Sequence, residues 1–158
     1  MNKQNTLINY FIFYVATLSF FAVGAITTLG LDWYRTIILP TFALQEFTVA
    51  VVWAALFMLV AGSMSMVWNV APRNKVFTAL TALYMGNSLL VLLWNYLFFG
   101  AHQLSYAAGA AGLVLLSVVA LLVLTWKISS RASLLLAPYF AWMLYAVYFC
   151  YQVTILNT

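Results

Sequence analysis

Charge is what this sequence has least of. Its 158 residues include six Lys or Arg and only two Asp or Glu. The few charged residues leave four uncharged stretches, residues 4–31, 47–72, 76–126 and 132–158. Residues 47–72 would reach about 39 Å as a helix, more than the roughly 30 Å of a bilayer's hydrocarbon core. Each of the three shorter stretches can therefore cross a membrane once.

The longest stretch, residues 76–126, would reach about 77 Å as one helix, which is too long for a single crossing and suits two crossings with a turn. The turn is predicted where the polar residues of this stretch gather, at Gly100, Ala101, His102, Gln103 and Ser105. The sequence thus predicts five transmembrane helices, over residues 7–29, 44–69, 76–99, 104–128 and 133–156.

The predicted fold is an all-α integral membrane protein, a five-helix bundle formed by a single domain over residues 1–158. Helices are expected because a segment in lipid must satisfy its own backbone hydrogen bonds, and the alternating ten-residue strands of a membrane barrel are missing from the sequence. The first apolar run exceeds 20 residues and has no convincing small-x-small cleavage site before Asp32. We therefore predict that it is a retained helix and not a signal peptide. The single Cys150 excludes an internal disulfide.

The sequence also lacks the residue sets of conventional enzymes. It has no Cys and His at a useful spacing, no paired carboxylates beyond Asp32 and Glu46, and no glycine-rich phosphate loop. We therefore predict no catalytic residue, no metal site and no required cofactor. The scattered basic residues form no stripe that could follow a phosphate backbone, so no nucleic acid is expected as a partner.

Basic residues predict the orientation. With five crossings, all but one of them fall on the N-terminal side of the membrane; these are Lys3, Arg73, Lys75, Lys127 and Arg131. Arg35 alone falls on the other side. The positive-inside rule then places the N-terminus in the cytoplasm and the C-terminus outside.

Aromatic residues are plentiful, with six Trp, ten Tyr and twelve Phe. Trp53 and Trp142 each lie about nine residues into a predicted helix, roughly 14 Å below its start. Indole rings at that depth could line a pocket for a large, flat, apolar ligand, because they offer stacking faces and an N–H group that fixes orientation. They could instead only fill space between helices, and composition alone favours this packing role.

The connection between the first two helices, residues 30–43, is the longest and least regular. It contains Asp32, Trp33, Tyr34, Arg35 and Pro40. Its aromatic residues could be ordinary anchors at headgroup depth, or the connection could be a lid over a site. Both interpretations stay open on the sequence.

Three blocks of the sequence resemble the TspO/MBR family of tryptophan-rich sensory proteins, which includes the mitochondrial translocator protein. The first block contains Trp33, Tyr34, Ile37, Pro40, Phe42, Phe47, Val52, Trp53, Leu56 and Phe57. The second contains Trp94, Leu97, Phe98, Phe99, Gly100 and Ala101. The third contains Lys127, Ile128, Ser129, Ala132, Leu135, Pro138, Tyr139, Ala141, Trp142 and Ala146. The blocks follow the family's order and cover nearly the whole chain.

Departures from the family pattern mark this chain as a divergent member. Leu44-Gln45 stands where the family usually has Pro-Pro, and Leu39 where it has a basic residue. Val91 and Cys150 occupy two positions that are usually Asn, and Asn95-Tyr96 replaces a Ser-Pro pair. The polar role of those Asn residues must therefore be lost or met elsewhere. The last residues, 153–158, include no basic residue, so the family's sterol binding is not expected.

The resemblance implies a membrane receptor or carrier that binds a tetrapyrrole, such as protoporphyrin or haem, between the helices and beneath the first connection. The ligand-binding residues predicted on this basis are Trp33, Trp53, Trp94, Tyr106, Trp142 and Ala146. Two alternatives remain. Bound porphyrin could be degraded under light with Trp53 and Trp142 as electron donors, or the protein could bind no ligand and regulate a membrane partner. The short loops and the spread of the family favour a bacterial membrane.

Three further features are open to two interpretations each. The small-residue pairs Ser105/Gly109 and Ala108/Gly112 suit a homodimer contact or packing within the chain. His102 could ligate haem iron, although a solvated turn histidine is favoured because no second ligand lies nearby in sequence. Glu46 is expected to complement the dipole at the start of the second helix rather than carry protons.

Overall fold

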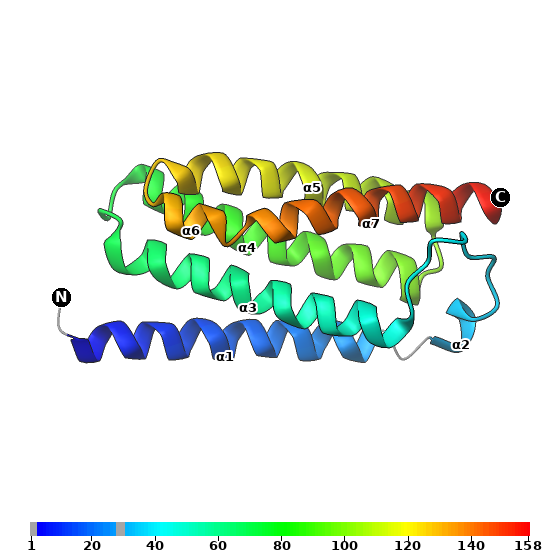
Figure 1. Cartoon of the computed structure of the whole chain (residues 1–158), viewed down its shortest axis with the longest axis horizontal. Coiled ribbons are helices and arrows are strands. Elements are labelled where there is room, and N and C mark those ends of the chain that lie inside the picture. Colours follow the sequence, from blue (N-terminus) through cyan, green and yellow to red (C-terminus); the bar gives the residue numbers. More distant parts are fainter. Residues whose placement is uncertain (1–2, 28–30) are drawn as a thin grey trace.

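The computed structural model describes residues 3–27 and 31–158 and shows a bundle of long helices lying side by side (Figure 1). The long helices are α1 (Lys3–Thr27), α3 (Glu46–Val70), α4 (Lys75–Asn95), α5 (Leu104–Trp126) and α7 (Ala137–Leu156). Helix α4 continues into a π-helical turn, η2 (Tyr96–Gly100). Two short helices, α2 (Leu31–Tyr34) and α6 (Ser130–Leu134), lie in the connections. The predicted all-α bundle of five helices is confirmed.

The helix boundaries agree with the prediction to within a few residues. The four segments Glu46–Val70, Lys75–Gly100, Leu104–Trp126 and Ser130–Leu156 are long and apolar enough to cross a membrane, and α1 contains the apolar segment Thr6–Ser19 among its described residues. The predicted end of the first helix at residue 29, and the start of the first connection at residue 30, lie outside the described residues. The start of α1 and the C-terminus lie at opposite ends of the bundle (Figure 1), as an odd number of crossings requires.

One predicted helix, residues 133–156, is divided in two. Ser129 begins α6 by accepting a hydrogen bond from the Ala132 amide at 3.3 Å. Pro138 lies in the first turn of α7 and has no N–H to offer the preceding turn, so α6 ends at Leu134 and the chain bends before α7 begins.

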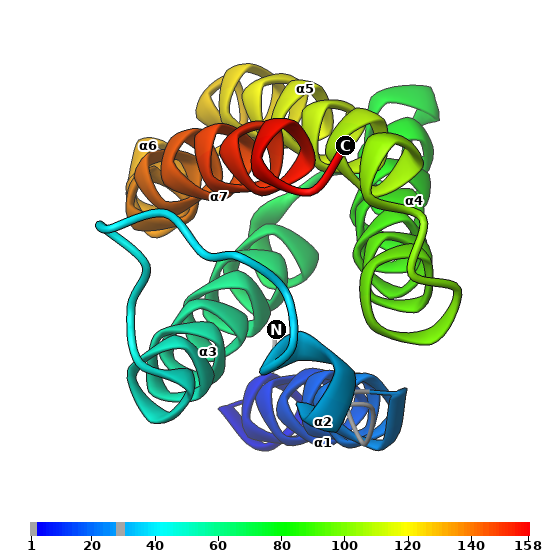
Figure 2. The same ribbon diagram turned by 90° about the vertical axis from the view of Figure 1, so that its right-hand side faces the viewer.

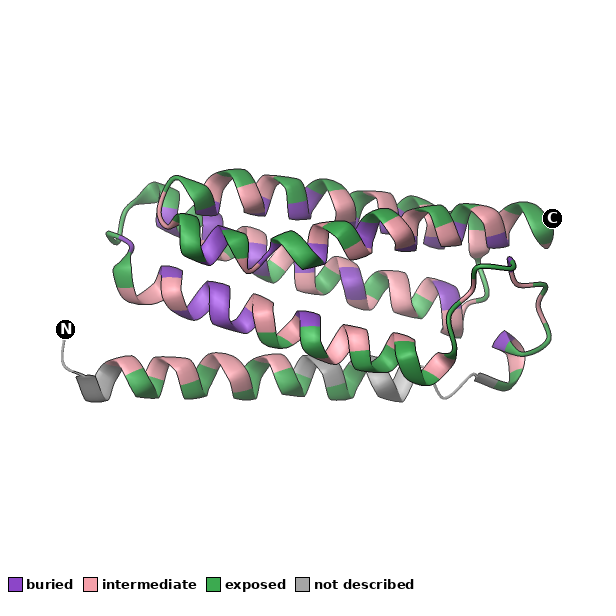
Figure 3. Cartoon of the chain, in the orientation of Figure 1, coloured by how far each residue is buried: buried purple, intermediate pink, exposed green. Residues whose placement is uncertain are grey.

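Helix α5 is the centre of the packing, with α4 on one side and α7 on the other, while α1 lies against α3 (Figure 2). Buried residues face the interior of the bundle and exposed residues cover its outside (Figure 3). Large apolar side chains dominate that outer surface, including Phe47 on α3 and Leu116 on α5. No described side chain of α1 is fully buried, so α1 is the most peripheral helix. An outer surface of this kind suits contact with lipid.

A buried hydrogen-bond network joins four helices at one end of the bundle. The Ser63 hydroxyl donates to the Ala132 carbonyl at 2.7 Å, and it lies 2.7 Å from the Tyr84 hydroxyl. Tyr84 in turn lies 3.2 Å from the Thr125 hydroxyl. Because no water enters the hydrocarbon core, each of these polar groups depends on the others for a partner.

A second network joins α4, α5 and α7 closer to the other end of the bundle. The Asn87 amide donates to the Ser117 hydroxyl at 2.7 Å and accepts from the Tyr139 hydroxyl at 3.2 Å. The Ser117 hydroxyl in turn donates to the Val114 carbonyl at 2.7 Å. Together the two networks fix the relative positions of α3, α4, α5, α6 and α7.

Replacing Tyr84 with Phe tests the first network. The substitution keeps the buried ring but removes the hydroxyl that Ser63 and Thr125 share, and we expect a loss of about 1 kcal/mol. Thermal unfolding of the purified protein in detergent should show a midpoint lowered by a few degrees. Tyr96→Phe, at an exposed tyrosine, is the matched control. Equal midpoints for the two variants would contradict a stabilising role for the network.

Candidate functional site

Four aromatic side chains from three helices meet inside the bundle and form what we call the aromatic cluster: Trp53 of α3, Trp94 of α4, and Tyr139 and Trp142 of α7. Trp53 is at its centre. The centroid of its ring lies 6.0 Å from that of Trp94, 6.2 Å from Tyr139 and 6.2 Å from Trp142. The contacts are tilted or edge-to-face, as aromatic pairs prefer. Trp53 and Trp142 therefore point inward and face each other.

Apolar residues surround the aromatic cluster. They include Leu56, Val91, Val114, Met143 and Ala146, all of them buried. Ala146 lies one helical turn beyond Trp142 on α7. The cluster is thus an apolar site whose polar atoms are few.

The polar atoms of the aromatic cluster differ in whether they have partners. The Trp94 indole N–H donates to the Cys150 sulfur at 3.3 Å, and the Tyr139 hydroxyl donates to Asn87. The Trp142 indole N–H is buried and has no hydrogen-bond partner among the described residues. An unsatisfied buried donor costs free energy, about 1–3 kcal/mol. Trp142 therefore presents an open donor inside an aromatic site.

Polar side chains lie near or at the two positions that are usually Asn in the family pattern. Val91 is part of the apolar wall, but Asn87, one helical turn earlier on the same helix, supplies a buried amide. Cys150 serves as the acceptor for Trp94. A thiol is a weaker acceptor than an amide oxygen.

The connection between α2 and α3 lies across the end of the bundle (Figure 2); we call residues 35–45 the cover loop. The Asn157 side chain, just past α7, accepts from the Ile38 amide and donates to the Ile38 carbonyl, both at 2.9 Å. The Tyr145 hydroxyl reaches the Leu44 amide and the Phe42 carbonyl at 3.4 and 3.5 Å. The cover loop is therefore fastened to α7.

An ion pair holds the two ends of the cover loop together. The Arg35 guanidinium donates to both carboxylate oxygens of Glu46, at 3.2 and 3.1 Å. The hydrogen bond with Glu46 and the charge of that carboxylate raise the pKa of Arg35. Glu46 is the first residue of α3, as expected for a carboxylate that complements the helix dipole. The pair also shows that Glu46 has a specific partner, which the sequence did not predict.

Trp33 lies beside the cover loop rather than in the aromatic cluster. Its ring stacks on His102 with centroids 4.0 Å apart, and it meets Phe98 edge-on at 6.0 Å. His102 is exposed and adopts a positive φ of 57° in the turn after η2. Tyr34, next to Trp33, is buried, and burial raises its pKa to about 12, with smaller contributions from Tyr145, Glu46 and Cys150. Short α2 thus closes the end of the bundle with aromatic rings.

The structure brings together four of the six residues predicted to bind ligand: Trp53, Trp94, Trp142 and Ala146. Trp33 lies over the adjacent end of the bundle. Tyr106 is 70% exposed on the outer face of α5 and does not join the aromatic cluster. Sequence reasoning assigned no site role to Tyr139, Tyr145 or Asn87. An Asn in the middle of an apolar helix was the available signal for Asn87.

The fold and the aromatic cluster define a multi-pass α-helical membrane protein with an internal aromatic site. A family model of the TspO/MBR family matches residues 11–156, and the chain belongs to this family. It is 29% identical over 132 residues to protein CrtK of Rhodobacter capsulatus, which covers 84% of this chain and 82% of the relative. It is 25% identical to the tryptophan-rich protein TspO of Bacillus cereus over 98% of both chains. Over 120 residues it is 32% identical to the translocator protein of Sus scrofa, covering 74% of this chain and 70% of the relative.

Asn157→Ala tests the fastening of the cover loop. The change removes both hydrogen bonds to Ile38, so the loop should open more often, and hydrogen exchange at residues 38–44 should become faster by several-fold. Thr158→Ala is the matched control, because the Thr158 hydroxyl bonds only within the end of its own helix. If the loop amides exchange at the same rate in both variants, Asn157 does not hold the loop.

Proposed function

We propose that this protein is a membrane receptor or carrier for a flat hydrophobic ligand, a tetrapyrrole such as protoporphyrin or haem, held at the aromatic cluster. The observation that carries the proposal is the unsatisfied indole N–H of Trp142 among rings from three helices. A ligand with a carboxylate or ring nitrogen would give this donor an acceptor. Its flat apolar body would stack on the neighbouring rings.

Ligand entry requires the rings to separate, because Trp53 is in direct contact with Trp94, Tyr139 and Trp142. Helix α3 contacts α7 only sparingly and packs mainly on α1 and α6. Ser63, which ties α3 to the first buried network, lies ten residues beyond Trp53, so the Trp53 end of α3 can move away from Trp142 while that network stays formed. The cover loop would release its hydrogen bonds to Asn157 and Tyr145 at the same time. Opening and closing of this kind suits a carrier, and one similar protein is named a translocator protein.

The proposed orientation places the cover loop on the non-cytoplasmic side. The turns between α3 and α4 and between α5 and α6 lie at the same end of the bundle as the start of α1 (Figure 1). Those turns carry Arg73, Lys75, Lys127 and Arg131, which the positive-inside rule assigns to the cytoplasm. The ligand would then enter from the outer side of a bacterial membrane.

Titration with protoporphyrin tests the proposal. Binding should quench the tryptophan fluorescence of the purified protein, and Trp142→Phe, which keeps an aromatic ring but removes the N–H, should weaken binding about five- to tenfold. Trp142→Ala should weaken it further because a stacking face is also lost. Trp68→Phe, at the far end of α3, is the control and should bind like the unmodified protein. Equal affinities for Trp142→Phe and the unmodified protein would rule out a role for the indole N–H.

A light-dependent breakdown of bound porphyrin is the second candidate function. Trp53 and Trp142, the electron donors that this function would use, are in direct ring contact. Illumination of the complex would then bleach the porphyrin absorbance, and a Trp53→Phe/Trp142→Phe double variant that still holds porphyrin at saturating concentration would not bleach it. A porphyrin absorbance that stays stable under light would contradict this second function, and the carrier function would then be the one that remains.

We propose further that α5 mediates a homodimer. A Cβ atom added at Gly109 or Gly112 would meet nothing within 4 Å, so these small residues leave space that no other part of the described chain fills. Gly109→Leu should shift the protein in detergent from dimer to monomer by size-exclusion chromatography with light scattering. Gly86→Leu is the control, because Gly86 has similar open space but lies on α4. An unchanged mass for Gly109→Leu would exclude this face.

A further inference from the structure

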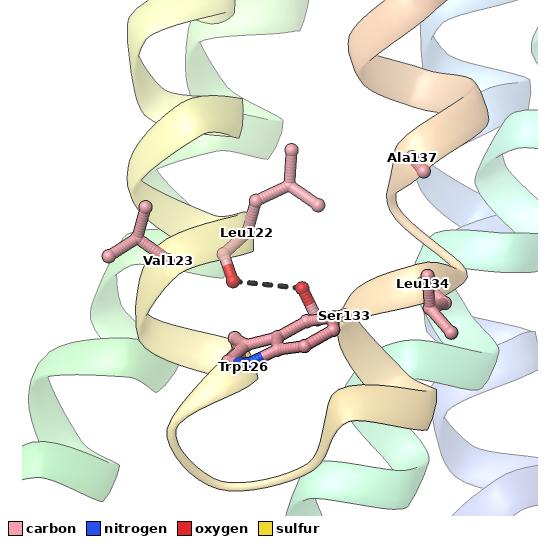
Figure 4. A pocket seen from close by; sticks show the side chains of 6 residues that line it. All are labelled: Leu122, Val123, Trp126, Ser133, Leu134 and Ala137. Atoms are coloured by element: carbon pink, nitrogen blue, oxygen red, sulfur yellow. Dashed lines mark hydrogen bonds between the residues drawn. The ribbon is translucent and has the colours of Figure 1, made fainter.

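An apolar groove lies on the outside of the bundle, at the end opposite the cover loop (Figure 4). It has a volume of about 250 Å³ and runs between α5 and the α6–α7 bend. Leu122, Val123 and Trp126 of α5 form one wall, and Ser133, Leu134 and Ala137 form the other. None of its lining residues belongs to the aromatic cluster, so it is a separate feature of the molecule.

The lining of the groove offers almost no polar atom to a guest. Its one hydroxyl, on Ser133, is buried and donates to the Leu122 carbonyl at 2.8 Å (Figure 4). The space itself arises because α6 ends at Leu134 and α7 begins at Ala137, which bends the chain away from α5. The groove therefore suits a saturated hydrocarbon chain. Its volume is below the roughly 300–1,000 Å³ of pockets for drug-sized ligands, so a tetrapyrrole would not fit.

Two cations belong to the segment that connects the two walls of the groove. Lys127 directly follows Trp126 on one wall, and Arg131 precedes Ser133 on the other; both are exposed. Neither forms an ion pair within residues 31–158, where both ion pairs involve Arg35 at the opposite end of the bundle. Arg73, at the same end as the groove, is already engaged, because it stacks on Trp68 and Phe77 and donates to the Trp68 carbonyl. Lys127 and Arg131 are thus available to an external anion.

The groove and the two cations lie at membrane depths that allow one molecule to contact both. Trp126 is exposed and ends α5, as expected for a tryptophan at headgroup level. Val123 and Ala137 lie about one helical turn further into the bundle than Trp126 and Ser133 (Figure 4). A molecule with its anionic group at Lys127 and Arg131 would thus extend its hydrocarbon chain along the groove toward the membrane interior.

We infer that this groove is a binding site for an anionic glycerophospholipid, with one acyl chain between α5 and α7 and the phosphate group at Lys127 and Arg131. The inference is independent of the tetrapyrrole proposal, because it uses none of the same residues. A zwitterionic lipid offers the same chains, but its own cation compensates the phosphate. The site therefore selects by headgroup charge.

Native mass spectrometry of the detergent-purified protein tests the site, with phosphatidylglycerol and phosphatidylcholine of identical chains as probes. The unmodified protein should retain phosphatidylglycerol in preference to phosphatidylcholine. Lys127→Gln and Arg131→Gln should each weaken phosphatidylglycerol retention roughly fivefold, and the double variant roughly 25-fold, while phosphatidylcholine retention stays the same. Lys75→Gln, which removes an exposed cation from the same end of the bundle, should have no effect.

Variants that fill the groove provide a second test of the lipid site. Ala137→Phe should lower retention of both lipids several-fold, whereas Ala79→Phe, at an exposed alanine of α4, should lower neither. Circular dichroism and a single elution peak establish that each variant is folded. Equal retention of the two lipids by the unmodified protein would overturn the inference. So would full phosphatidylglycerol retention by the double Gln variant, or lipid retention that Ala137→Phe leaves unchanged.

Discussion

The absence of water from the hydrocarbon core is the constraint on which this structure depends. Each polar side chain placed inside the bundle must find its partner within the protein. Ser63, Tyr84 and Thr125 meet this requirement at one end, and Asn87 and Tyr139 meet it nearer the other. These bonds set which faces of the helices meet, and so they determine where the aromatic rings gather. The Trp142 indole N–H is a departure from the rule, and it lies where the rings gather.

The proposed function rests on that departure. A carrier must hold its ligand without fixing it permanently, and a site that is apolar, aromatic and short of one acceptor offers such a balance. The cover loop closes one end of the bundle and is held there by a few hydrogen bonds. At the opposite end, the bend between α6 and α7 opens a groove to the lipid. Two features with different chemistry are thus separated by the length of the bundle.

Most of the fold could be predicted from the sequence, because the spacing of six basic and two acidic residues leaves segments whose lengths match a bilayer. The division of the last helix was missed, although Pro138 carried the signal. The inward orientation of Trp53 and Trp142 could be expected from the family resemblance but not from helical periodicity, since these helices are apolar on all sides. The outward position of Tyr106, the pairing of Arg35 with Glu46 and the open donor of Trp142 depend on tertiary packing, which single-sequence patterns do not encode.

The indole N–H resonances provide the most direct measurement of the central claim. In ¹⁵N-labelled protein, with the Trp142 signal assigned by comparison with Trp142→Phe, saturating protoporphyrin should move the Trp142 indole proton downfield as it gains an acceptor. The signal of Trp68, outside the aromatic cluster, should stay in place. A Trp142 resonance that does not move while porphyrin binds would show that the open donor is not the ligand's anchor and would contradict the account.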